Sequence, residues 1–107
     1  MGQSRRQRPA RLAAKLREIR IKLDWTQKQM TKRLRKIKAG LQPGHVSEYE
    51  TGKREPSLLM LLEYARIAGI PMEVLIDDNL DLPKHLPILP EQYILVMKRV
   101  RTSPRNH

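Results

Sequence analysis

The stretch 25–56 contains two helix starts separated by a turn, and this arrangement constrains the fold more than any other feature. Thr26 can cap the first helix, whose apolar residues recur at helical spacing: Met30, Leu34 and Ile37. Pro43 fits the first turn of a second short helix, in which Val46 and Tyr49 lie three positions apart on one side. The sequence therefore predicts two short helices, each with one buried face.

Further helices are predicted on both sides of this pair. From Pro9 to about Leu23 the apolar spacing is helical, and Lys15 is expected outside the apolar stripe. Ser57 and Gly69 bracket another helix. We expect its buried face to consist of Leu58, Leu61, Leu62 and Ala65. With a short fifth helix over 70–76, the predicted fold class is all-α.

Length and composition limit the domain organisation. The 107 residues are enough for one small domain with tails. We expect a basic disordered arm over 1–8, the helical domain over 9–78, and a proline-rich linker with a C-terminal strand over 79–107. The chain has no cysteine and no apolar run of ~20 residues, so we expect no disulfide, no membrane span and a cytoplasmic location.

The positive charge is unevenly distributed. The net charge is +11, yet the segment 57–81 is acidic while the segments before and after it are basic. Basic surface binds polyanions favourably because each neutralised phosphate releases condensed counterions. The charge pattern therefore favours a nucleic-acid partner.

Two motifs carry a resemblance to a known family. Residues 25–27 (WTQ) and 46–58 (VSEYETGKREPSL) are similar to the signature of the Cro/repressor-type helix-turn-helix family, also called lambda-repressor-like or XRE. The resemblance extends from about Leu16 to Ile76 and implies a five-helix domain that binds double-stranded DNA.

The resemblance also implies roles for individual residues. Gln27 corresponds to a glutamine that hydrogen-bonds the DNA backbone, and Lys53 and Arg54 correspond to a loop that lies along the phosphates. Arg20 and Glu50 correspond to an ion pair that holds the domain together. Arg54 is alternatively a brace for its own loop.

In the family, bases are read mainly from positions that correspond here to Pro43, Gly44, His45, Ser47 and Glu48. His45 can donate to guanine or to a phosphate, Ser47 can bond to several bases, and Glu48 can accept from cytosine N4. Gly44 would let the backbone approach DNA closely. Gln42 is expected either to cap the helix or to contact adenine.

The segment between Leu34 and Val46 is several residues longer than the family's usual turn. Its residues either extend the preceding helix as far as Gly40 or form a basic loop. In both cases Lys36 and Lys38 are candidates for additional phosphate contacts, although the insertion is equally explained as a tolerated surface loop.

An apolar, β-rich run begins at Tyr93 and continues to Val100. It is predicted to form a strand that pairs with a second subunit, and a short helix docked on its own domain is the alternative. The expected dimerisation residues are Tyr93, Ile94, Leu95, Val96 and Met97.

The sequence thus predicts a sequence-specific, double-stranded-DNA-binding transcriptional regulator, a homodimeric repressor rather than an enzyme. No catalytic constellation is present, and no cofactor is expected. The spacing of His45, His85 and His107 fits no metal-ligand motif. One alternative is an antitoxin or coactivator-like module that binds a protein partner through its C-terminal segment. A second is a single-strand or RNA binder, which the scarcity of aromatic residues disfavours.

Overall fold

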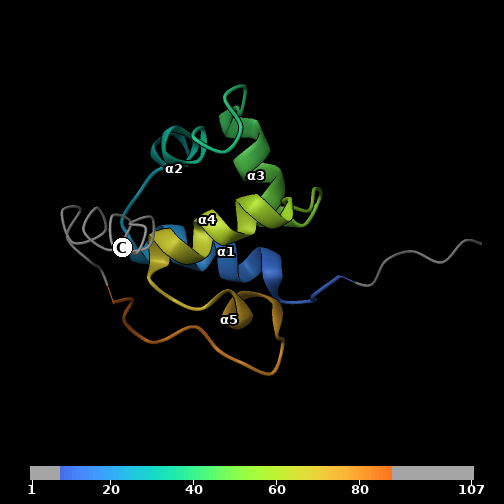
Figure 1. Ribbon diagram of the computed structural model, residues 1–107, viewed down its shortest axis with the longest axis vertical. Coiled ribbons are helices and arrows are strands. Elements are labelled where there is room, and N and C mark those ends of the chain that lie inside the picture. The colour runs from blue at the N-terminus through green and yellow to red at the C-terminus, as the bar shows by residue number, and fades with distance from the viewer. Residues whose placement is uncertain (1–7, 88–107) are drawn as a thin grey trace, which may run out of the picture.

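Five helices make up the regular secondary structure of the protein in a computed structural model that describes residues 8–87 (Figure 1). No strand forms among these residues, so the all-α prediction is confirmed. None of their helices is long and apolar enough to span a membrane. Residues 1–7 of the arm predicted over 1–8 and the predicted dimerisation residues 93–97 lie outside the described part. The helices are α1 (Leu12–Lys22), α2 (Gln27–Leu34), α3 (Pro43–Thr51), α4 (Leu58–Ala68) and α5 (Met72–Ile76).

Several helix ends are set by the residues that the sequence indicated. The Thr26 hydroxyl accepts a hydrogen bond from the Gln29 backbone N–H at 3.0 Å, and the side-chain Oε1 of Gln29 accepts one from the Thr26 backbone N–H at 2.8 Å. Ser57 caps α4 in the same way with its hydroxyl. Gly52 and Gly69 end α3 and α4 with φ of 82° and 71°, a region that favours glycine.

A single apolar core lies between the five helices. In Figure 1, α1 and α4 cross the middle of the molecule, with α2 and α3 on one side and α5 on the other. The helix α3 packs against both α1 and α2, and α4 lies against α2 and α5. The core side chains from the first three helices are Leu12, Leu16, Ile19, Met30, Leu34, Val46 and Tyr49. The core therefore fixes α2 and α3 relative to each other.

The prediction for Lys15 is wrong, because this side chain is buried and only 2% exposed. Its ammonium donates hydrogen bonds to the carbonyl oxygens of Val74 at 2.7 Å and Asp77 at 2.9 Å. These carbonyls are near the end of α5, where helix carbonyls lack intrahelical partners. Burial and the neighbouring charge of Arg11 lower the pKa of Lys15. Lys15 thus ties α1 to α5 by satisfying polar groups inside the fold.

The start of α1 also differs from the prediction. The helix begins at Leu12 rather than at Pro9, and the turn that precedes it is held by the carboxylate of the distant residue Asp78. Asp78 accepts hydrogen bonds from the backbone N–H groups of Ala10 at 2.8 Å and Arg11 at 3.0 Å. These hydrogen bonds hold the pKa of Asp78 below its ordinary value. A local sequence pattern cannot reveal a hydrogen-bond acceptor supplied from so far along the chain.

The folded unit extends past the predicted domain end at residue 78. Leu82 and Leu86 are buried in the core, and the Lys22 ammonium donates to the carbonyl oxygen of Lys84 at 2.6 Å. Pro87 packs closely on Gly69. A Cβ atom added to Gly69 would lie only 2.8 Å from the carbonyl oxygen of Pro87. Residues 79–87 therefore belong to the domain rather than to a linker.

The prediction that the first residue of α4 is buried is wrong. Leu58 is 70% exposed, whereas Leu61 and Ala65 are buried as expected. Ser57 occupies the cap position, so Leu58 begins the first turn of the helix, away from the core.

The first prediction concerns Lys15. Replacing Lys15 with Met removes both hydrogen bonds to α5 and leaves two carbonyl oxygens without this donor. We expect the free energy of unfolding, measured by urea denaturation, to fall by about 1–3 kcal/mol. Arg17→Met is the matched control, because Arg17 is exposed on the same helix. Equal stability of the two variants would show that the Lys15 contacts contribute nothing.

The second prediction concerns the pH dependence of stability. A carboxyl whose folded pKa is lowered stabilises the fold above its unfolded pKa and loses this effect as the pH falls through the folded pKa. Asp78→Asn should therefore be less stable than the wild type at pH 7. This difference should shrink as the pH falls below the ordinary pKa of 3.8.

The control for Asp78 is Glu73→Gln, which changes an exposed carboxylate in the same acidic segment, 57–81. Urea denaturation of the three proteins at several pH values measures the effect. A pH-independent difference between Asp78→Asn and the wild type would contradict the assigned role of the Asp78 carboxylate.

Candidate nucleic-acid interface

The first turn of α3 is open to solvent. Gln42 and Gly44 are exposed, whereas Val46 and Tyr49 on the other side of the helix are buried. A Cβ atom added to Gly44 would meet no atom within 4 Å, so the backbone here is accessible to a large partner. The amino end of α3 also presents backbone N–H groups, which attract anions.

His45, rather than the Gln42 side chain, makes the hydrogen bond that caps this end of α3. Its Nδ1 accepts from the Gln42 backbone N–H at 2.9 Å, while the Gln42 amide only reaches the Gly40 carbonyl oxygen at 3.5 Å. An acceptor at Nδ1 places the proton of a neutral imidazole on Nε2. His45 therefore has a donor left for a ligand, and the Gln42 side chain does not fill the expected cap role.

Ser47 and Glu48 follow on the partly exposed side of α3. The carboxylate of Glu48 accepts a hydrogen bond from the Arg54 Nε at 2.7 Å, and both side chains remain substantially exposed. This hydrogen bond lowers the pKa of Glu48. Glu48, which was expected to contact a base, is thus paired with Arg54, which was expected to lie along the phosphates.

Behind α3, a polar network connects three helices. Arg20 donates to both oxygens of Glu50, at 2.7 and 3.1 Å, and also to the Trp25 carbonyl oxygen at 2.8 Å. The Gln27 amide donates to Glu50 at 3.1 Å. The Arg20–Glu50 ion pair implied by the resemblance is therefore present, and Gln27 is oriented by the same carboxylate. The Glu50 side chain is only 2% exposed.

The inserted segment forms a loop, because α2 ends at Leu34 and Gly40 does not terminate a helix. Leu41 is fully buried, and its carbonyl oxygen accepts a hydrogen bond from the Arg35 Nε at 2.9 Å. Lys38 is exposed between these anchors. The loop is thus tied down at both ends and exposed in the middle.

Lys36 has a second role that the sequence did not indicate. Its ammonium lies 3.3 Å from the carboxylate of Glu63, which is only 3% exposed in α4. The Nη1 of Arg66 is the other cationic group near this carboxylate, at 4.0 Å from the Glu63 Oε1. A buried carboxylate needs such partners, so Lys36 anchors the loop to α4 as well as being a candidate for a phosphate contact.

The loop after α3 is also held in place. The backbone N–H groups of Lys53 and Arg54 donate to the Glu48 carbonyl oxygen at 3.0 and 3.2 Å. The Lys53 side chain is exposed. Gly52 makes the turn that brings this loop beside α3.

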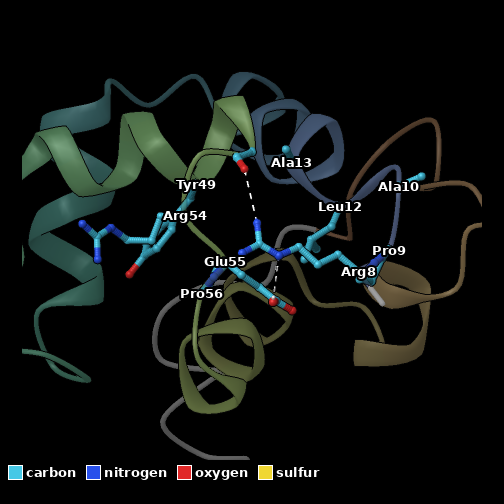
Figure 2. Close-up of a pocket in the computed structure, with 10 residues that line it drawn as sticks. Arg8, Pro9, Ala10, Leu12, Ala13, Tyr49, Arg54, Glu55 and Pro56 are labelled. Atoms are coloured by element: carbon cyan, nitrogen blue, oxygen red, sulfur yellow. Dashed lines mark hydrogen bonds and ion pairs between the residues drawn. The ribbon is translucent and has the colours of Figure 1, made fainter. Parts of the chain in front are cut away.

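Arg8 joins the same loop from the other end of the chain. Figure 2 shows its guanidinium between the Glu55 carboxylate, at 3.4 Å, and the Gly52 carbonyl oxygen, at 3.5 Å. A shallow pocket of about 200 Å³ lies here between the start of α1 and the loop. The sequence analysis missed this contact because Arg8 lies far along the chain from Gly52 and Glu55, and no local pattern connects them.

Within residues 8–87, no group of His, Asp and Glu side chains is arranged to hold a metal ion.

The comparison with protein families decides the assignment. A family model described as helix-turn-helix matches residues 16–75, more than half of the chain. The chain belongs to the lambda-repressor-like helix-turn-helix family. This family membership makes it a DNA-binding helix-turn-helix regulator, with α2 and α3 as the two helices of the motif. Neither curated proteins nor solved structures gave a match to the chain.

The third prediction tests the network behind the helix-turn-helix motif. Glu50→Ala leaves the partly buried Arg20 without its carboxylate partner, so the free energy of unfolding should fall by about 3 kcal/mol. Glu18→Ala is the control, because Glu18 is an exposed carboxylate on α1. A loss no larger than that of the control in urea denaturation would exclude the network as a major source of stability.

Proposed function

We propose that this protein is a sequence-specific transcriptional regulator that binds double-stranded DNA and acts as a repressor. The observation that carries the proposal is the exposed first turn of α3, with donors at its end and exposed cations beside it. A helix of this kind enters the major groove, where base edges present a distinct pattern of donors and acceptors.

In the proposed complex, two sets of contacts have different tasks. The Nε2–H of His45, the Ser47 hydroxyl and the Glu48 carboxylate contact base edges. Gln27, Lys53 and Lys38 contact phosphates, which position the protein but carry no sequence information. The side-chain NH₂ group of Gln27 already donates to Glu50, and its side-chain oxygen can only accept hydrogen bonds. The proposed phosphate contact at Gln27 therefore also uses the backbone N–H groups at the amino end of α2.

Several features favour duplex over single-stranded nucleic acid. Single-strand binders stack bases on exposed aromatic rings. Tyr49 and Tyr64 are buried, and the face of Trp25 is covered by the Arg33 guanidinium at 5.2 Å from the ring centre. In residues 8–87, no aromatic side chain is therefore available as a stacking platform.

We further propose that the protein acts as a cytoplasmic homodimer through residues 93–97, without a cofactor or enzymatic activity. A two-fold dimer would read two half-sites about 34 Å apart, so its target would be palindromic. The alternative of an antitoxin or coactivator-like module depends on the same C-terminal segment and on a protein partner.

The fourth prediction uses selection of bound duplexes from random DNA, followed by affinity measurements at several salt concentrations. We expect a defined, palindromic motif for the wild type. Substituting His45 or Ser47 with Ala should change the preferred base at one position, at a cost of ~1–3 kcal/mol for the original site. Lys53→Ala should weaken binding to all duplexes and reduce the salt slope by about one.

Lys84→Ala is the matched control for the charge change, because Lys84 is exposed in the segment after α5. It should leave both the motif and the salt slope unaltered. Binding without any preference among duplexes would refute sequence-specific recognition, and a non-palindromic motif would refute the dimer alone.

A further inference from the structure

The contact between Glu48 and Arg54 joins the outer face of α3 to the loop that follows it. The Arg54 Nε lies 2.7 Å from the Glu48 Oε1, and the backbone N–H of the same arginine donates to the Glu48 carbonyl oxygen. One arginine therefore holds both the main chain and the side chain of one glutamate. The loop conformation set by Gly52 at φ 82° makes this double contact possible.

Glu55 is the carboxylate next to Arg54 in the sequence. Glu55 lies beside Arg8, and in Figure 2 the guanidinium of Arg54 points away from Arg8. Lys53 adds positive charge near Glu48, and with Arg54 it favours the ionised form of this carboxyl. At neutral pH the Glu48 carboxylate is thus charged and lies among cations.

A carboxylate on a DNA-reading surface has an electrostatic cost, because phosphates repel it. A neighbouring guanidinium cancels this repulsion and fixes the carboxylate geometry at the same time. Both side chains remain accessible, at 40% for Glu48 and 50% for Arg54. Among the described residues, only Oε1 of Glu48 and Nε of Arg54 take part in this hydrogen bond.

We propose that Arg54 is a positioning residue that determines specificity through Glu48. By holding Oε1, Arg54 aims Oε2 at a base edge, where a carboxylate accepts from cytosine N4. The two Nη groups of Arg54 remain available to a phosphate, so one ion pair links base selection to backbone contact. This inference rests on the proposed function, since it requires that α3 reads duplex DNA.

The fifth prediction is tested on the full chain with duplexes that differ at single base pairs. Glu48→Gln first identifies the position that Glu48 reads, as the one where the preference for a C·G pair is lost. Arg54→Ala should reduce this preference by about tenfold. In the double variant the loss should equal that of Glu48→Gln alone, because Arg54 acts on the preference only through Glu48.

Two controls separate positioning from simple charge loss. Lys53→Ala removes a neighbouring cation and should weaken binding to all duplexes while leaving the preference for cytosine unchanged. Arg54→Lys keeps the charge but not the planar guanidinium. Its overall affinity for duplexes should therefore exceed that of Arg54→Ala, while its preference for cytosine should stay below that of the wild type. Both side chains are exposed, and circular dichroism should show an intact helical fold in every variant.

The outcomes distinguish this inference from the proposed function. If Arg54→Ala weakens binding equally to all duplexes, Arg54 is a phosphate ligand only and the inference fails. If Glu48→Gln changes no preference, Glu48 reads no base and the inference also fails, while sequence-specific binding by the wild type stands. If the wild type itself shows no preference among duplexes, the proposed function fails and the inference fails with it.

Discussion

The buried carboxylate of Glu50 is the interaction on which the arrangement of the helix-turn-helix motif depends. It accepts from Arg20 at the end of α1 and from Gln27 at the start of α2, while it belongs to α3 itself. An ionised group that is 2% exposed persists only when it is paired and hydrogen-bonded. The same contacts therefore fix the relative positions of three helices.

Much of the fold follows from local sequence. Thr26, Ser57, Gly52 and Gly69 act at helix ends through their own chemistry, and their effects extend over a few residues only. The buried stripe of α1 follows from its period in the same way. Lys15 and Asp78 escape this reasoning because each satisfies a distant backbone group. Neither the spacing of apolar residues nor the capping preferences predict which lysine donates to a backbone carbonyl of a distant helix.

The candidate site could be predicted in part. The exposed end of α3 follows from Pro43 and from the apolar side of that helix, and the Arg20–Glu50 pair follows from the family resemblance. Charge partners could not be predicted, because a chain with 22 basic residues offers many candidates for each carboxylate. The contacts of Glu48 and Lys36 depend on where the two loops turn in space.

The loop between α2 and α3 has a consequence for how the protein can diversify. Arg35 closes it onto Leu41, and Lys36 attaches it to Glu63, so its ends are fixed independently of the tip. At Gly40 an added Cβ atom would meet nothing within 4 Å. The tip is therefore a position where residues can be exchanged or added while the two flanking helices keep their crossing. Related regulators could acquire new target preferences at this tip without rebuilding the domain that supports it.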